Sequence, residues 1–180
     1  GLVIAGNSGR EEMQDVLLVH PDAVVPTQPF SLKQNAIVGT SSARRKAQIK
    51  FWRPDVETKD IRGNVPTRIK KLLDRQFDAI ILAKAGLKRI HADTGKCTLI
   101  DFNPKKFVPA PAQGVLAFQV RESEVELRQL LEKISNKNAW ETVEIERKLL
   151  AATGGGCHVP LGAYCEKTAG NFHLWAIFSP

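Results

Sequence analysis

Short apolar runs alternate with stretches of helical periodicity along most of this chain of 180 residues. An apolar run bounded by turn residues is typical of a strand, and a continuous run is typical of a strand covered on both faces. We predict strands at residues 1–7, 36–38, 56–61 and 78–83, the last of them a buried parallel strand. Between them we predict helices, one ending at Pro54 and one whose inward face carries Ile69, Leu72 and Leu73.

The second half of the chain begins with a proline-rich passage, residues 103–114, which is typical of a segment that crosses between domains. After it we predict a buried strand at residues 115–120, amphipathic helices at 123–134 and 139–153, and a strand at 172–178. One face of the first of these helices is apolar and carries Leu127, Leu130, Leu131 and Ile134. The alternation predicts an α/β fold with open, mainly parallel or mixed sheets.

The charge of the chain makes anions its expected ligands. Lys and Arg number 26 against 19 Asp and Glu, a net charge of +7, and such a balance attracts anions. The arginines stand in short separate clusters at the starts of elements, which favours a small polyanionic metabolite over nucleic acid. No apolar run approaches the roughly 18 residues of a membrane span, and residues 1–14 lack a signal-peptide pattern, so we expect no membrane partner.

Three widely spaced cysteines argue against a disulfide framework and fit a reducing cytoplasm. Their spacing does not match a zinc site, so we expect no metal. Cys157 differs from Cys97 and Cys165, which we interpret as packing or surface thiols, because three glycines at residues 154–156 precede it. Glycine runs cost conformational entropy and serve where the backbone needs a positive φ or where a bulky group comes close. A flexible turn with an incidental cysteine and a thiol presented in a cleft both fit this stretch.

Two strand-to-helix turns carry arginines of the kind that the net positive charge leads us to expect at an anion-binding site. In VGTSSARR, Thr40 to Ser42 form the turn and Arg44 and Arg45 fall in the first helical turns. In IRGNVPTR, Arg62 and Gly63 stand in the turn and Arg68 follows in the helix. A helix N-terminus is an anion site, and arginines placed there oppose the helix dipole unless an anion is bound. Planar arginine forks grip carboxylates in pairs of hydrogen bonds. We therefore predict a carboxylate site at this sheet edge.

Five segments of the chain resemble porphobilinogen deaminase, also called hydroxymethylbilane synthase, in their order and approximate spacing. They are VGTSSARR, DIRGNVPTR, FDAIILAKAGLKRI, PAQG and GGGCHVPLGAY, and the resemblance covers nearly the whole chain. It implies a transferase of tetrapyrrole biosynthesis (porphyrin and heme) that condenses four porphobilinogen molecules into hydroxymethylbilane with release of ammonia. It also implies a cytoplasmic protein that is a monomer at full length.

The resemblance implies a dipyrromethane cofactor attached through a thioether to Cys157. Positions that hold the acetate and propionate groups of the cofactor and growing chain match Thr40, Ser42, Arg44, Arg45, Arg62, Gly63 and Arg68. Positions at the incoming-substrate site match Arg89 and Gln113, and Arg147 matches an arginine that lines the cleft. The implied domains are remnant strands of a first domain at residues 1–12 and 113–124, a middle α/β domain at 13–112 that resembles a periplasmic-binding-protein lobe, and part of a smaller α+β cofactor-anchoring domain at 125–180.

The chain departs from the family pattern in one segment that matters for catalysis. Family members carry a His-Ser-x-Lys-Asp-x-Pro segment with the catalytic aspartate, and nothing in this sequence matches it. We do not assign that role to Asp15, so the catalytic residue is unknown. We expect a fragment that lacks most of the first domain and the end of the last, and that is inactive in isolation. The alternative is a non-catalytic lobe that binds a small anion.

Overall fold

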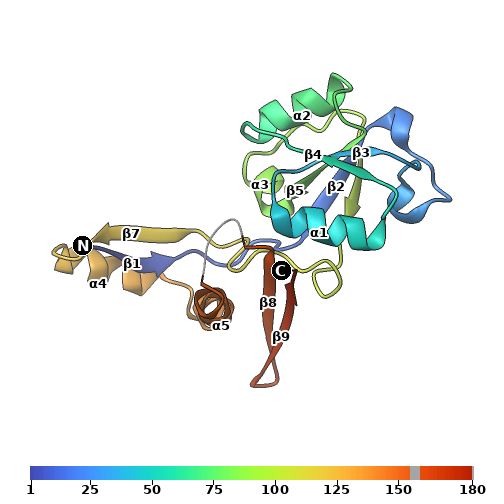
Figure 1. The fold of residues 1–180 in the computed structure, drawn as a ribbon. Coiled ribbons are helices and arrows are strands. Elements are labelled where there is room, and N and C mark those ends of the chain that lie inside the picture. Colours follow the sequence, from blue (N-terminus) through green and yellow to red (C-terminus); the bar gives the residue numbers. More distant parts are fainter. Residues whose placement is uncertain (155–158, 180) are drawn as a thin grey trace.

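The computed structural model describes residues 1–154 and 159–179. Within them the chain forms a five-stranded sheet, a two-stranded ribbon and a two-stranded hairpin (Figure 1). Cys157 lies outside the described residues. The five-stranded sheet belongs to one lobe, and the ribbon and hairpin lie to one side of it.

The lobe is built on a mixed sheet with the strand order β4-β3-β5-β2-β6. Strand β3 runs parallel to β4 and β5, whereas β2 is antiparallel to β5 and β6. The strands are β2 (Asp15–Val19), β3 (Ile37–Gly39), β4 (Glu57–Lys59), β5 (Ala79–Ala83) and β6 (Thr98–Asp101). The α/β prediction with a mixed sheet is therefore confirmed. The strand predicted as parallel, β5, is parallel only to β3.

Helices cover both faces of this sheet. One buried cluster contains Ile49 of α1 (Ala43–Trp52), and the opposite cluster contains Ile69 of α2 (Val65–Leu73) and Leu87 of α3 (Lys84–Arg89). The predicted inward face of α2 is right for Ile69 and Leu72 but wrong for Leu73, which is 43% exposed. Two 3-10 turns, η1 (Pro21–Ala23) and η2 (Pro29–Ser31), follow β2.

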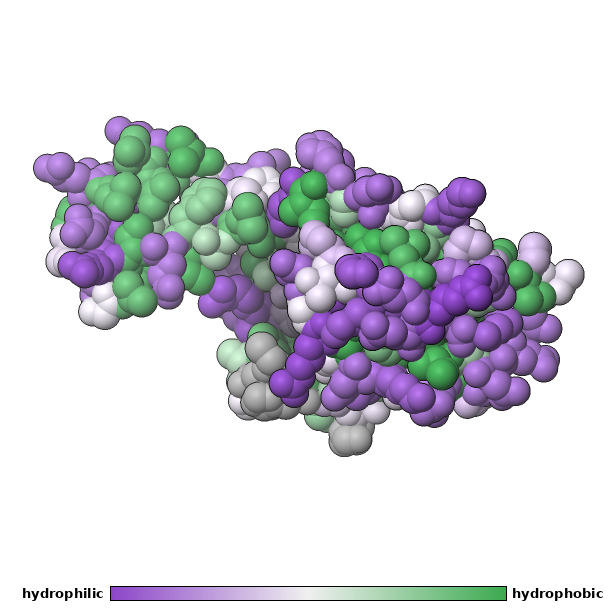
Figure 2. Space-filling model, turned by 90° about the horizontal axis from the view of Figure 1, so that it is seen from above, coloured by the Kyte–Doolittle hydropathy of each residue, from purple (hydrophilic) through white to green (hydrophobic). Residues whose placement is uncertain are grey.

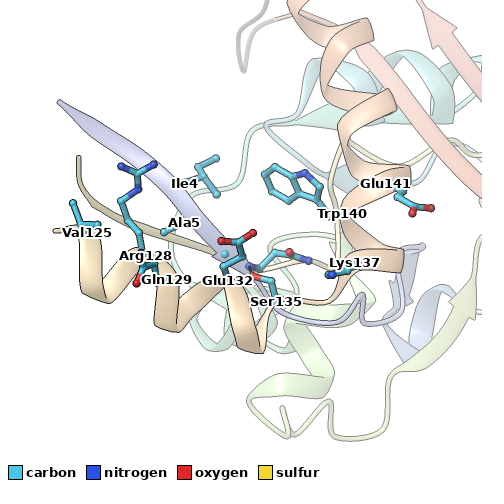
Figure 3. A pocket seen from close by; sticks show the side chains of 12 residues that line it. Ile4, Ala5, Val125, Arg128, Gln129, Glu132, Ser135, Lys137, Trp140 and Glu141 are labelled. Carbon is cyan, nitrogen blue, oxygen red and sulfur yellow. Dashed lines mark hydrogen bonds between the residues drawn. The ribbon is translucent and has the colours of Figure 1, made fainter. Parts of the chain in front are cut away.

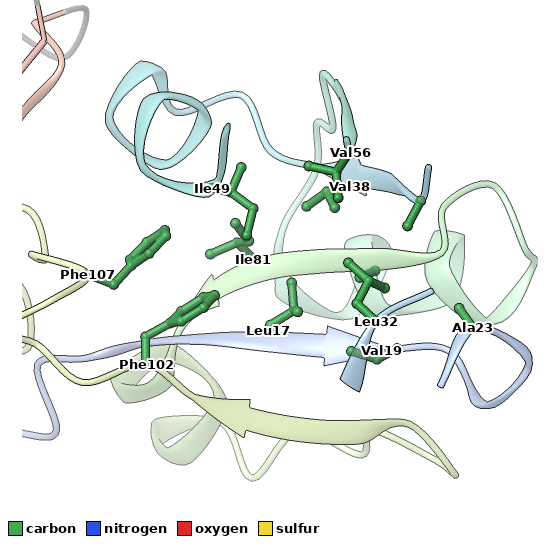
Figure 4. Packing of buried hydrophobic residues seen from close by; sticks show 12 residues of the cluster. Leu17, Val19, Ala23, Leu32, Val38, Ile49, Val56, Ile81, Phe102 and Phe107 are labelled. Atoms are coloured by element: carbon green, nitrogen blue, oxygen red, sulfur yellow. The ribbon is translucent and has the colours of Figure 1, made fainter. Parts of the chain in front are cut away.

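Alternate residues of β2 face opposite clusters, which explains its unbroken apolar run. Leu17 and Val19 pack with Ile81, Phe102 and Phe107 on one side (Figure 4), and Val16 and Leu18 belong to the cluster on the other. Because side chains alternate along a strand, a strand covered on both faces must be apolar at every position. The sheet therefore has two cores, one on each face.

The ribbon pairs β1 (Leu2–Asn7) with β7 (Ala117–Arg121) in antiparallel register, with a shift between Ile4 and Gly6. Helix α4 (Val125–Ile134) lies against it, and a Cβ at Gly6 would stand 2.6 Å from Ser135 Oγ. The strand predicted at residues 115–120 is present as β7, but the prediction that it is buried is wrong. The side chains of β7 alternate between exposed and half-buried, as expected where one face of a ribbon lies against a helix, here α4.

Helix α5 (Lys137–Ala152) contacts the hairpin of β8 (Leu161–Thr168) and β9 (Asn171–Phe178). The predicted strand at residues 172–178 and both late helices are confirmed. The apolar face of α4 is largely open, since Leu127, Leu130 and Ile134 are exposed and Leu131 is half-buried. Figure 2 shows apolar side chains gathered at the end that holds the ribbon and a mostly hydrophilic lobe surface. Among the described helices, none has the length and hydropathy of a membrane span.

Candidate anion-binding site

The turns that follow β3 and β4 lie side by side at one edge of the lobe. The backbone N–H of Thr40 donates to the carbonyl of Lys59 (2.9 Å). Ser41 Oγ donates to the carbonyl of Ile61 (2.9 Å) and accepts from the Ile61 N–H (3.0 Å). Because β3 and β4 are parallel neighbours, their carboxyl ends meet at the same edge, and one serine joins the two turns there. The structure thus brings both arginine-bearing turns together.

Each turn opens a capped helix. Ser42 Oγ accepts the N–H of Arg45 at the start of α1 (3.4 Å), and Asn64 Oδ1 accepts the N–H of Thr67 at the start of α2 (3.0 Å). The first turn of each helix, fully described, carries no acidic residue. Both positive helix ends therefore face the same edge without a carboxylate of their own, which favours an anion there.

The backbone conformation at position 63 requires a glycine. Its φ is +117°, a conformation that side-chain-bearing residues rarely adopt, and a Cβ would stand 2.7 Å from Thr67 Cγ2. The carbonyl of Gly63 accepts the Arg68 Nε–H (2.7 Å), which holds that side chain at the turn. The predicted site residue Gly63 thus shapes the turn that carries Arg62 and Arg68.

A buried carboxylate organises the other two arginines. Asp15 is fully buried at the start of β2, and its Oδ2 accepts from Arg44 Nη1 (2.8 Å). Its Oδ1 accepts from Arg45 Nε (3.1 Å) and Nη2 (2.6 Å). Burial raises the pKa of the Asp15 carboxyl, but the charges of Arg45 and Arg44 outweigh this and lower it below its ordinary value. Asp15 is therefore ionised at neutral pH and neutralises one of the two guanidinium charges.

Arg68 has no carboxylate partner among the described residues. It is half-buried, and burial together with the positive charge of Arg45 lowers the pKa of its guanidinium. Arg45 and Arg68 follow the two turns that Ser41 joins, so two like charges stand at this edge. Arg62 is exposed in the same turn and likewise makes no ion pair within the part of the chain that the structure describes. An anion bound between these arginines would relieve the repulsion.

The remaining predicted site residues are placed differently. Gln113 is half-buried and its Nε2 donates to Asp15 Oδ1 (2.9 Å), so it joins the arginine cluster. Arg89 is exposed at the end of α3, and its Nη2 donates to the carbonyl of Gly114 (2.6 Å), next to Gln113. Arg147 is exposed on α5. The structure therefore gathers Arg44, Arg45 and Gln113 around Asp15, a residue that the sequence analysis did not assign to the site.

A separate hollow of about 600 Å³ lies between β1, α4 and α5 (Figure 3). Ile4 and Trp140 supply apolar surface to it, and Arg128, Glu132 and Glu141 are among its polar residues. None of its lining residues was predicted as a site residue, and none comes from the two arginine turns. Across residues 1–154 and 159–179 no group of three His, Cys, Asp or Glu side chains is arranged to hold a metal ion.

Two models of protein-family domains match the chain. The model described as "Porphobilinogen deaminase, dipyromethane cofactor binding domain" matches residues 1–129, and the model of the C-terminal domain of porphobilinogen deaminase matches residues 140–179. The mixed α/β lobe thus lies within residues that match a cofactor-binding domain. More particularly, the chain belongs to the porphobilinogen deaminase family. The resemblance seen in the sequence is confirmed.

Curated relatives agree with this assignment. Porphobilinogen deaminase of Syntrophomonas wolfei is 40% identical over 97% of this chain and 55% of its own length. The enzyme of Fusobacterium nucleatum is 41% identical over 98% of this chain and 57% of its own, and that of Geobacillus kaustophilus is 40% identical over 98% and 56%. The chain spans a little over half the length of these relatives.

Solved structures similar to the chain include solute-binding proteins. An ancestral cationic amino acid solute-binding protein gives a TM-score of 0.44 at 13% identity, covering 81% of this chain and 58% of its own. An arginine-specific periplasmic binding protein of Salmonella typhimurium gives 0.46 at 9% identity, covering 79% and 61%. These TM-scores are too low to establish a shared fold.

Proposed function

We propose that the protein containing this chain is a hydroxymethylbilane synthase of tetrapyrrole biosynthesis, which condenses four porphobilinogen molecules and releases ammonia. Its family membership supports the reaction, and the arginine edge supports the substrate class, because each pyrrole ring carries an acetate and a propionate. The observation that carries the proposal is the meeting of the two arginine-bearing turns, which Ser41 joins through its hydrogen bonds with Ile61. A ligand carboxylate supplies the missing negative charge.

The residues fit a dipyrromethane group held at this edge. Arg68, Arg62 and the capped N-termini of α1 and α2 offer donors to its carboxylates, and Thr40 and Ser42 line the first turn. When bound through a thioether to Cys157, the dipyrromethane supplies the terminal pyrrole to which the next ring is joined. The protein's own part is to orient the carboxylates and hold the chain in place, which converts encounters into intramolecular steps.

Further parts of the proposal concern the cleft around this edge. Arg89 and Gln113 bind the incoming porphobilinogen, and Arg147 lines the cleft for the growing product. Residues 1–12 and 113–124 form part of one domain, 13–112 a middle domain and 125–180 part of a third. The protein is a cytoplasmic monomer at full length. The 180-residue chain alone makes no hydroxymethylbilane, because the aspartate segment of the family is not in it.

Intact-mass spectrometry of the protein, in the length in which cells make it, tests this proposal. We expect a mass increased by two linked pyrrole rings, which Cys157→Ser abolishes and Cys165→Ser retains, because Cys165 is buried in β8. Arg68→Ala should lower the fraction that carries the added mass. Arg75→Ala is the matched control, because Arg75 is an exposed arginine paired with Asp22. Protein without the added mass, or an Arg68→Ala fraction equal to that of Arg75→Ala, contradicts the proposal and favours a non-catalytic anion-binding lobe.

A further inference from the structure

The carboxylate of Asp15 is the centre of a buried polar cluster that joins separate parts of the fold. Four protein donors bind its two oxygens: Arg44 Nη1, Arg45 Nε, Arg45 Nη2 and Gln113 Nε2. The side chain of Asp15 is completely inaccessible to solvent. Its oxygens are therefore occupied by the protein itself, and it acts on any bound ligand through its neighbours.

The burial of the arginines makes this carboxylate necessary. The side chain of Arg44 is 5% exposed and that of Arg45 is 12% exposed. A buried guanidinium without a counter-charge is strongly destabilising. One carboxylate facing two guanidiniums leaves the cluster with a single net positive charge, so the edge keeps its attraction for anions. Arg44 is also held by the Val108 carbonyl (2.8 Å), which fixes it within the protein.

The contacts of Arg45 determine which of its donors remain available. Asp15 takes the Nε–H and one Nη2 hydrogen, and the Ile81 carbonyl takes one Nη1 hydrogen (3.2 Å). One hydrogen on each terminal nitrogen is left without a partner among the described residues. A guanidinium held along its Nε edge presents its terminal nitrogens in a fixed direction. Asp15 thus sets how Arg45 is presented beside Arg68.

Gln113 connects this cluster to both segments that link the lobe to the ribbon. Its Nε2 donates to the carbonyl of Met13 (2.7 Å) as well as to Asp15. Met13 lies in the segment between β1 and β2, and Gln113 lies in the segment between β6 and β7. Asp15 and Gln113 therefore link Arg45 to both connections through hydrogen bonds.

We propose that Asp15 is a positioning residue of the anion site: it presents the terminal nitrogens of Arg45 to a ligand carboxylate and ties this arginine to Gln113 at the base of the lobe. The identity of the ligand, a pyrrole carrying carboxylates, rests on the proposed function. The positioning of Arg45 does not. Asp15 acts through the arginine and does not touch the ligand.

Calorimetric titration of the full chain with porphobilinogen, with urea unfolding of the same samples, tests this inference. We expect Asp15→Asn to weaken binding about tenfold or more, as loss of a charge-assisted hydrogen bond that orients a ligand group would. Asp55→Asn is the matched control, because Asp55 also binds a buried arginine, Arg53, away from the two turns. It should lose stability and keep its affinity. Asp15→Asn adds one net positive charge, so unchanged or tighter binding overturns the inference.

Two further measurements keep the outcome decisive. Asp15→Glu retains the charge and moves the carboxylate by one methylene, so weaker binding at near-parental stability supports positioning, and parental affinity overturns it. The NMR signal of the Arg45 Nε–H needs no ligand: protection from exchange in the parent and Asp55→Asn chains, lost in Asp15→Asn, supports the role. Retained protection in Asp15→Asn refutes it. A parent chain that binds no porphobilinogen counts against the proposed function alone.

Discussion

Buried arginines of the lobe differ in what neutralises them, and this difference separates structural from ligand-binding side chains. Arg53 is 4% exposed, and its guanidinium binds both oxygens of Asp55 and the carbonyls of Pro29, Leu32 and Lys33. All five N–H donors of this guanidinium are used, three on carbonyls of residues 29–33 and two on Asp55. Arg68, in contrast, donates its Nε–H to the Gly63 carbonyl and has no carboxylate within the described part of the chain. The first arginine stabilises a loop, and the second is available to a ligand.

The ion pair of Asp55 predicts a pH dependence of stability. The hydrogen bonds from Arg53 lower the pKa of Asp55 from 3.8 to about 2. Because the pKa of the folded state lies below that of the unfolded state, the contribution of Asp55 to stability is fully present above about pH 4 and is lost as the pH falls through about 2. We expect the difference in Tm between parent and Asp55→Asn to be constant near neutral pH and to shrink between these values. A difference that does not change with pH would contradict this.

At the scale of elements, the N-terminus of α1 combines a stabilising cap with a place for an anion. Substitutions of Ser42 distinguish the effect of the cap on stability from the effect of the helix end on anion binding. Ser42→Ala removes the cap of the Arg45 N–H and should cost about 1 kcal/mol of unfolding free energy. Ser42→Asp keeps a good cap and favours the dipole, so it should retain stability. It also places a negative charge at the anion edge, so it should weaken porphobilinogen binding in calorimetry. Equal binding by Ser42→Asp and the parent chain would show that α1 does not face the ligand.

The elements that sequence patterns predicted are those with strong local signals. Helix α2 follows an Asn cap and a proline in its first turn, and β5 is a continuous apolar run. The sequence analysis assigned no strand to β2, β6 or β8. An unbroken apolar run at residues 16–19 could have indicated β2, whereas β6 has four mostly exposed residues and β8 is interrupted by a glycine. The exposure of β7 was not predictable, because it depends on which elements cover the two faces of the ribbon.

The candidate site was likewise predictable from sequence only where its features are local. The two arginine turns could be predicted, because cap residues, arginines and the sheet edge are all local features of the sequence. The partnership of Asp15 could not, because Arg44 and Arg45 are 29 and 30 positions away and Gln113 is 98. Non-local contacts of this kind appear only when the strand order is known. Sequence patterns therefore located the two arginine-bearing turns, and the structure showed which carboxylate binds Arg44 and Arg45.

At the scale of the whole molecule, one buried carboxylate joins α5, the hairpin and both segments that enter the lobe. Glu146 of α5 is fully buried and accepts from Arg10 Nη1 (2.6 Å) and Nη2 (3.1 Å). It also accepts the backbone N–H groups of Ala112 (2.7 Å) and Cys165 (2.7 Å). Arg10 precedes β2, Ala112 precedes β7, and Cys165 lies in β8. Glu146 therefore joins these parts through four hydrogen bonds.

Replacing this carboxylate should loosen the joint while leaving the lobe intact. Glu146→Gln leaves Arg10 with no counter-charge from Glu146 and turns an acceptor into a donor, so we expect a loss of about 3–5 kcal/mol of unfolding free energy. Hydrogen exchange should accelerate at the Ala112 and Cys165 amides and stay slow in β2 and β5, whose bonds do not involve Glu146. Glu141→Gln on the same helix removes an exposed pair with Lys167 and should cost less than about 1 kcal/mol. Equal costs for the two substitutions, or faster exchange throughout the lobe, would show that Glu146 does not act as a local joint.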